Sequence, residues 1–89
     1  MGNAHRPSKQ ELQTAVDYAL GGDWQKAHAM VDDYDGDPMA MWVHAVVHRM
    51  EGDLANAGYW YHRCGRELRD EVSTQDELRE IREALGPRP

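Results

Sequence analysis

Two histidines and a glutamate recur at helical spacing in the most apolar stretch of the chain. His44, His48 and Glu51 are four and three residues apart, so their side chains share one face of a helix. Two imidazoles and a carboxylate match the ligand set of an open site for a divalent metal such as zinc. The H-E-x-x-H pattern of metalloproteases is absent. The pattern therefore favours histidines that only pack and hydrogen-bond, with no cofactor, and leaves metal binding or acid–base catalysis as alternatives.

Two more histidines lie close in sequence to this stretch. His28 is on the inward stripe of the preceding helical segment, and His62 is in the following one. They are the next candidates for ligands if a metal binds. We assign no catalytic residue, because the sequence contains no nucleotide loop and no Ser-His-Asp arrangement.

Aromatic and cationic residues gather after the histidines and predict a binding surface. Tyr59 and Trp60 are adjacent, Trp60 lies off the inward stripe of its helix, and His62 and Arg63 follow directly. Arg49 belongs to the same set. Aromatic residues and arginine are enriched at protein interfaces, so we expect docking on a protein partner or on a second copy in a homodimer. The alternative for the arginines is ion pairing with nearby acidic residues.

Capping and breaking residues divide the chain into helical segments. Ser8 and Glu11 form a capping box, Asp37-Pro38 is a helix start, and Gly86-Pro87 is a helix end. We predict a flexible leader over residues 1–7 and one all-helical domain over 8–89. Within it we expect a hairpin over 8–35, a second hairpin over 37–66 and a C-terminal capping helix over 73–86. The apolar residues 39–50 predict the helix around which the others pack.

The two predicted hairpins align with each other at an offset of thirty residues. The matched pairs include Ala15 with Ala45, Val16 with Val46, Gly22 with Gly52, Asp23 with Asp53, and Ala27 with Ala57. Each copy reads as a helix, a Gly-Asp turn and a second helix with a small residue at the crossing. This periodicity predicts two stacked copies of one helical unit.

The repeated pattern resembles that of tetratricopeptide and Sel1-like repeats. The residues that carry the resemblance are Ala45, Gly52-Asp53, Ala57 and Tyr61, with their counterparts thirty residues earlier. It implies protein or peptide binding in a groove lined by the first helix of each hairpin. The segment WVHAVVHRMEGDLANAGYWYHR also resembles one carried by small, mostly uncharacterised bacterial proteins, a likeness that implies no activity.

Composition sets limits on the partners of the chain. Its 89 residues carry 10 Lys plus Arg against 16 Asp plus Glu, a net charge of -6 with histidine neutral, which argues against nucleic acid and anionic membranes. A core this small gains from pairing with another subunit. The single cysteine, Cys64, fits a reducing compartment, and no segment suggests export, so we expect a cytoplasmic protein.

Overall fold

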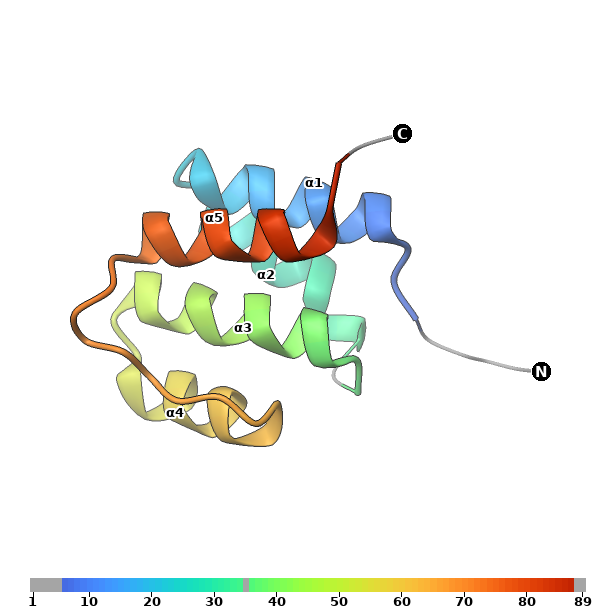
Figure 1. The fold of residues 1–89 in the computed structure, drawn as a ribbon. Helices are drawn as coiled ribbons and strands as arrows, with labels where there is room; N and C mark the ends of the chain where they lie inside the picture. The colour runs from blue at the N-terminus through green and yellow to red at the C-terminus, as the bar shows by residue number, and fades with distance from the viewer. Residues whose placement is uncertain (1–5, 35, 88–89) are drawn as a thin grey trace.

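Five α-helices make up the fold, which is taken from a computed structural model that describes residues 6–34 and 36–87 (Figure 1). The helices are α1 (Lys9–Leu20), α2 (Trp24–Val31), α3 (Pro38–Glu51), α4 (Leu54–Arg63) and α5 (Thr74–Leu85), and a short 3-10 helix η1 (Asp32–Tyr34) follows α2. The predicted all-helical class is confirmed. Most of the predicted leader lies outside the described residues. No helix in the described ranges is long and apolar enough to cross a membrane.

The helices begin where the capping residues predict. Both hydrogen bonds of the capping box form at the start of α1, where the Ser8 hydroxyl accepts from the Glu11 N–H and the Glu11 carboxylate accepts from the Ser8 N–H. At the other helix starts a side-chain oxygen accepts the N–H three residues further on, and the residues concerned are Asp23, Asp37, Asp53 and Ser73. Local hydrogen bonds therefore fix where these helices start.

The turns that join α1 to α2 and α3 to α4 have the same backbone geometry. Gly22 and Gly52 adopt φ of 90° and 88°, in the left-handed region that favours glycine. The N–H of Asp23 donates to the carbonyl of Tyr18, and that of Asp53 to the carbonyl of His48, both at 2.9 Å. Each turn brings two consecutive helices together as a packed pair.

Helix α3 is the centre of the fold. It packs against every other helix of the described ranges. Its residues 40–47 are all buried, and they are Ala40, Met41, Trp42, Val43, His44, Ala45, Val46 and Val47. This confirms the prediction that the apolar segment forms the helix around which the others pack, because burial on all sides needs apolar residues on all sides.

Helix α5 lies on α1 and α3 rather than on the end of the stack (Figure 1). Its apolar residues Leu78 and Ile81 are fully buried there. In the described part of the chain, α4 packs closely against α3 alone among the helices and reaches α5 through the Tyr61 side chain. The expected capping helix therefore covers the first helices of the two pairs and leaves α4 at an open end.

Candidate functional site

Three histidines from two helices form a cluster. His28 comes from α2, and His44 and His48 come from successive turns of α3. The Nε2 atoms of His28 and His44 are 3.0 Å apart. The rings of His44 and His48 are stacked, with centroids 5.0 Å apart and planes at 15°. One ring nitrogen from each of the three lies within 4.8 Å of the others. His28 therefore lies beside the two histidines predicted on one face of α3, although it is sixteen positions before His44 in the sequence.

Glu51 contacts His48, one of the two α3 histidines of the cluster. Its Oε1 lies 2.5 Å from Nδ1 of His48, whose side chain is 12 % exposed. A carboxylate at Nδ1 favours the tautomer that carries the proton there and leaves the Nε2 lone pair free. Glu51 therefore contacts a histidine of the cluster and sets its orientation.

Trp60 of α4 covers the buried side of the cluster. Its ring is stacked on that of His44 with centroids 4.1 Å apart and planes at 13°, and His44 is 3 % exposed. The guanidinium of Arg63 lies over Trp60 at 4.9 Å and over Tyr59 at 5.6 Å. Trp60, predicted as a surface anchor, is half-buried and links the histidines to the outer residues of α4.

The outer face of α4 is exposed and carries aromatic, aliphatic and cationic side chains. Leu54 is 56 % and Tyr59 is 55 % exposed, and both are large apolar residues. His62 and Arg63 are also exposed. Four of the five predicted binding residues thus come from this helix, and three of those four are on its solvent side.

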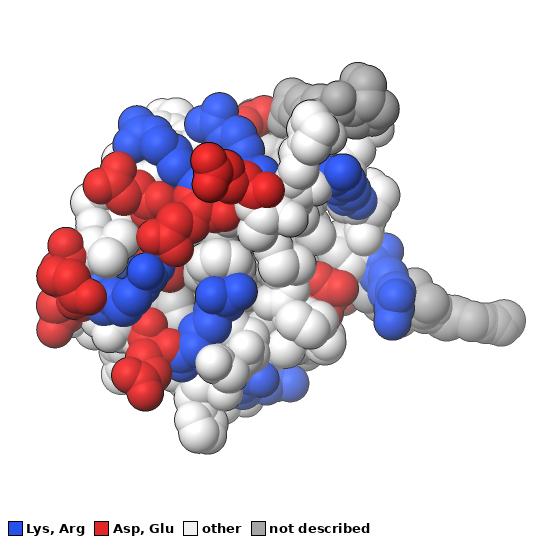
Figure 2. All heavy atoms as spheres, in the orientation of Figure 1, with Lys and Arg blue, Asp and Glu red and all other residues white. Residues whose placement is uncertain are grey.

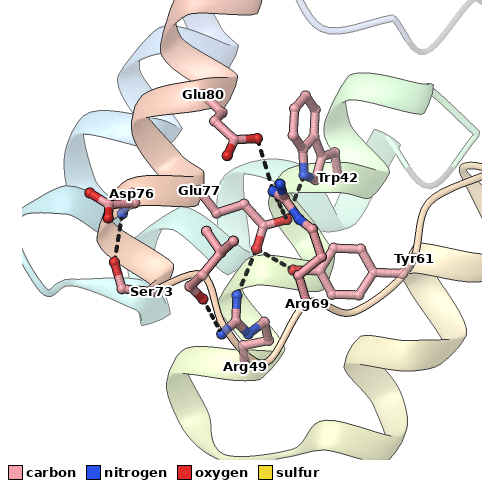
Figure 3. Close-up of polar contacts among 9 residues, drawn as sticks. Trp42, Arg49, Tyr61, Arg69, Ser73, Asp76, Glu77 and Glu80 are labelled. Carbon is pink, nitrogen blue, oxygen red and sulfur yellow. Dashed lines mark hydrogen bonds and ion pairs between the residues drawn. The ribbon is translucent and has the colours of Figure 1, made fainter.

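Arg49, the remaining predicted binding residue, points into the molecule instead. Its side chain is 11 % exposed, and its guanidinium donates to Oε1 of Glu77 at 2.8 Å and to the carbonyl of Val72 at 2.7 Å (Figure 3). Burial opposes the charge of Arg49, but hydrogen bonds with Tyr61 and Glu77 outweigh it and raise its pKa. Arg49 therefore fixes the fold and is not available to a partner.

Glu77 is the centre of a polar network that the sequence patterns do not predict. It is 1 % exposed, and besides Arg49 it accepts from Trp42 Nε1 at 2.8 Å and from the Tyr61 hydroxyl at 2.6 Å. Nη2 of Arg69 lies 3.8 Å from the second carboxylate oxygen of Glu77, Oε2. Figure 3 shows these side chains converging on the carboxylate from α3, α4 and the loop before α5. With its oxygens engaged in this way, Glu77 is a structural counter-ion rather than a base for catalysis.

A sequence signal for Glu77 does exist, although it is weak. Glu77 is four residues before Ile81 and next to Leu78, on the inward stripe of α5. A helix start nevertheless commonly carries acidic residues that are exposed. The sequence therefore predicts an exposed carboxylate at residue 77, whereas the structure buries it.

The charged face around α5 shows no single-sign patch. Figure 2 shows acidic and basic side chains interspersed over α5 and the adjoining loop. Exposed pairs on this face include Arg69 with Glu80 and Arg79 with Asp76, both at 2.9 Å. Such a face offers no concentrated positive field to a polyanion.

Cys64, at the end of α4, is half-buried and its thiol lies 3.5 Å from the carbonyl of Tyr61. Burial raises the pKa of the Cys64 thiol. A thiol of raised pKa is mostly protonated at neutral pH and is a poor nucleophile.

Comparison of the chain with known proteins gives no match to a family model, to a curated protein or to a solved structure. The resemblance to tetratricopeptide and Sel1-like repeats therefore has no family match in support of it. The established description is a small all-helical protein with packed helix pairs.

Proposed function

We propose that the protein is a small helical interaction module that docks through the outer face of α4. The observation that carries the proposal is the exposure of Leu54 and Tyr59, each more than half accessible, on the helix at the open end of the stack. Apolar side chains beside an arginine have the composition of protein interfaces. Burial of these side chains by a partner would remove apolar surface from water.

The position of α5 supports docking at α4 over docking in a repeat groove. The resemblance to helical repeats implies a groove lined by the first helix of each pair. In this chain those helices are α1 and α3, and α5 is packed against both. A peptide would have to displace α5, together with the buried hydrogen bonds of Glu77, to reach that groove. Within residues 6–34 and 36–87, no helix packs on the outer face of α4.

A second copy of the chain is the partner that we propose first. In the described part of the chain, no carboxylate lies within ion-pair distance of Arg63 or Arg66, which instead lie over aromatic rings. The chain has six more acidic than basic residues, 16 against 10, so a second copy supplies carboxylates for these arginines. Opposite charges placed across an interface set its register.

We also propose that the two helix pairs are copies of one repeating unit. Their turns share the same glycine conformation and the same hydrogen bonds, and Ala15, Ala45, Ala27 and Ala57 are all fully buried. Small residues at matching places let the helices of each pair approach closely. Superposition of the two pairs in an experimental structure tests this, and pairs that fail to align at the thirty-residue offset would refute it.

Sedimentation equilibrium tests self-association. We expect wild-type protein to pass from monomer to dimer as its concentration rises, and Tyr59→Ala to weaken the dimer at least about tenfold, or ~1.4 kcal/mol. Tyr18→Ala is the matched control, because Tyr18 is also exposed, at 37 %, but lies on α1. A wild-type protein that stays monomeric at high concentration would contradict self-association. Equal losses in both variants would place the interface away from α4.

A further inference from the structure

We propose that His28, His44 and His48 together bind one divalent transition-metal ion, with zinc as the reference ion. This site is separate from the docking face of α4 and does not depend on self-association. Imidazole nitrogen is a common ligand of zinc, copper, nickel and iron, and three such ligands leave one position of a tetrahedral zinc ion for water.

The spacing of the ring nitrogens fits a shared ion. Zinc–nitrogen bonds are ~2.0–2.1 Å long, so two ligands of a tetrahedral site lie about 3.3–3.4 Å apart. Nε2 of His28 and Nε2 of His44 are 3.0 Å apart, and one ring nitrogen from each of the three histidines lies within 4.8 Å of the others. A shift of a few tenths of an ångström between α2 and α3 opens the first pair to the ligand spacing.

Without metal, the contact between His28 and His44 needs one proton between two nitrogen atoms. One ring donates its Nε2–H and the other accepts. To bind the ion, the donor ring changes tautomer and carries its proton on Nδ1 instead. Both Nε2 lone pairs then face the metal while both rings stay neutral.

Glu51 is a positioning residue for this site, which revises the ligand set predicted from sequence. Its carboxylate lies 2.5 Å from Nδ1 of His48, and this places the proton on Nδ1 and leaves Nε2 as the ligand atom. A carboxylate behind a ligating histidine fixes the ring and raises its basicity. The sequence pattern of His44, His48 and Glu51 thus contains two ligands and one carboxylate that orients a ligand. The third ligand, His28, comes from α2.

A second set of potential ligands shares His48 but is less suited to hold an ion. His48, Glu51 and Asp53 also offer atoms within 4.8 Å of one another. The Asp53 carboxylate already accepts from Asn56 N–H at 3.2 Å and from Asn56 Nδ2 at 2.6 Å, which caps α4. These hydrogen bonds lower the pKa of Asp53. Asp53→Asn can still accept the capping N–H with its one amide oxygen, while it removes the charge and the second acceptor oxygen, so it separates the two sets.

Zinc titration of metal-free, full-length protein by calorimetry tests the site. We expect one zinc ion per chain and a rise in melting temperature with added zinc. His28→Ala, His44→Ala and His48→Ala should each reduce the affinity more than about 100-fold, and Glu51→Gln about 10–100-fold. The His62→Ala variant, which removes an exposed histidine of α4, should bind zinc as the wild type does. The Asp53→Asn variant should do the same.

The wild-type titration decides the proposal even if a histidine variant fails to fold, which circular dichroism will report. Absence of zinc binding to the wild type would overturn it. Full zinc binding by a folded His28→Ala variant would also overturn it, because the proposed site needs His28 as its third ligand. Loss of binding in Asp53→Asn with full binding in His28→Ala would assign the ion to the other set and refute the three-histidine site.

Discussion

The hydroxyl of Tyr61 on α4 donates a 2.6 Å hydrogen bond to Oε1 of Glu77 on α5. The same oxygen accepts from Arg49 on α3 at 2.8 Å, so one carboxylate oxygen joins three helices. Helices α4 and α5 otherwise have no close packing in the described ranges. This contact therefore carries the connection between the open end of the stack and the helix that covers α1 and α3.

Glu77→Ala should destabilise the fold by about 3–5 kcal/mol, because it leaves the Arg49 guanidinium buried without its counter-charge. Urea unfolding followed by circular dichroism measures the change. Glu80→Ala is the control, since the Glu80 side chain is 44 % exposed and pairs with Arg69 at the surface. It should cost at most ~1 kcal/mol. Equal effects of the two substitutions would contradict a structural role for Glu77.

Trp42→Phe should destabilise the protein by about 1.5–3 kcal/mol, because it removes the indole N–H that donates to the Glu77 carboxylate. Trp24→Phe makes the same chemical change at a half-buried tryptophan of α2 that is not part of this network. Thermal unfolding of both variants gives the comparison. The hydrogen bond would be of little consequence if the two melting temperatures fell by the same amount.

Stability should decline as the pH rises above 10. Burial, and then the hydrogen bond to Glu77, raise the pKa of Tyr61 above its ordinary value of 10.0. In the unfolded chain Tyr61 ionises near its ordinary pKa, whereas in the folded state it stays protonated. The contribution of Tyr61 is thus complete below pH 10 and is lost as the pH rises beyond that value. Urea unfolding at several alkaline pH values should show a shallower decline for Tyr61→Phe than for wild type, and identical slopes would count against this assignment.

Two glycines near α4 should respond to alanine in opposite directions. Gly52 has φ of 88°, so Gly52→Ala should destabilise the fold by about 1–2 kcal/mol through a strained left-handed residue. Gly58 lies inside α4, and a Cβ there meets nothing within 4 Å. Gly58→Ala should stabilise the fold by about 0.5–1 kcal/mol, because alanine is the better helix former. Chemical unfolding of both variants checks the two signs together.

The helix boundaries were largely determined by the sequence. Ser8 with Glu11, Asp37 with Pro38, and the turn at Gly52 act through hydrogen bonds and dihedral angles within a few residues. Such signals are local, so they can be read without knowledge of the remaining chain. The central position of α3 followed in the same way, because a helix that is apolar on all sides has to be surrounded.

The composition of the candidate sites was decided by the tertiary structure. His28 meets His44 across 16 positions, and Arg49 meets Glu77 across 28. The path of residues 64–73 then places α5 on α1 and α3, which buries Glu77 and leaves α4 open. Helical periodicity states which face of a helix turns inward but not which helix it meets. Partners so far apart in the chain are selected by the packing of whole helices, and no local pattern records that choice.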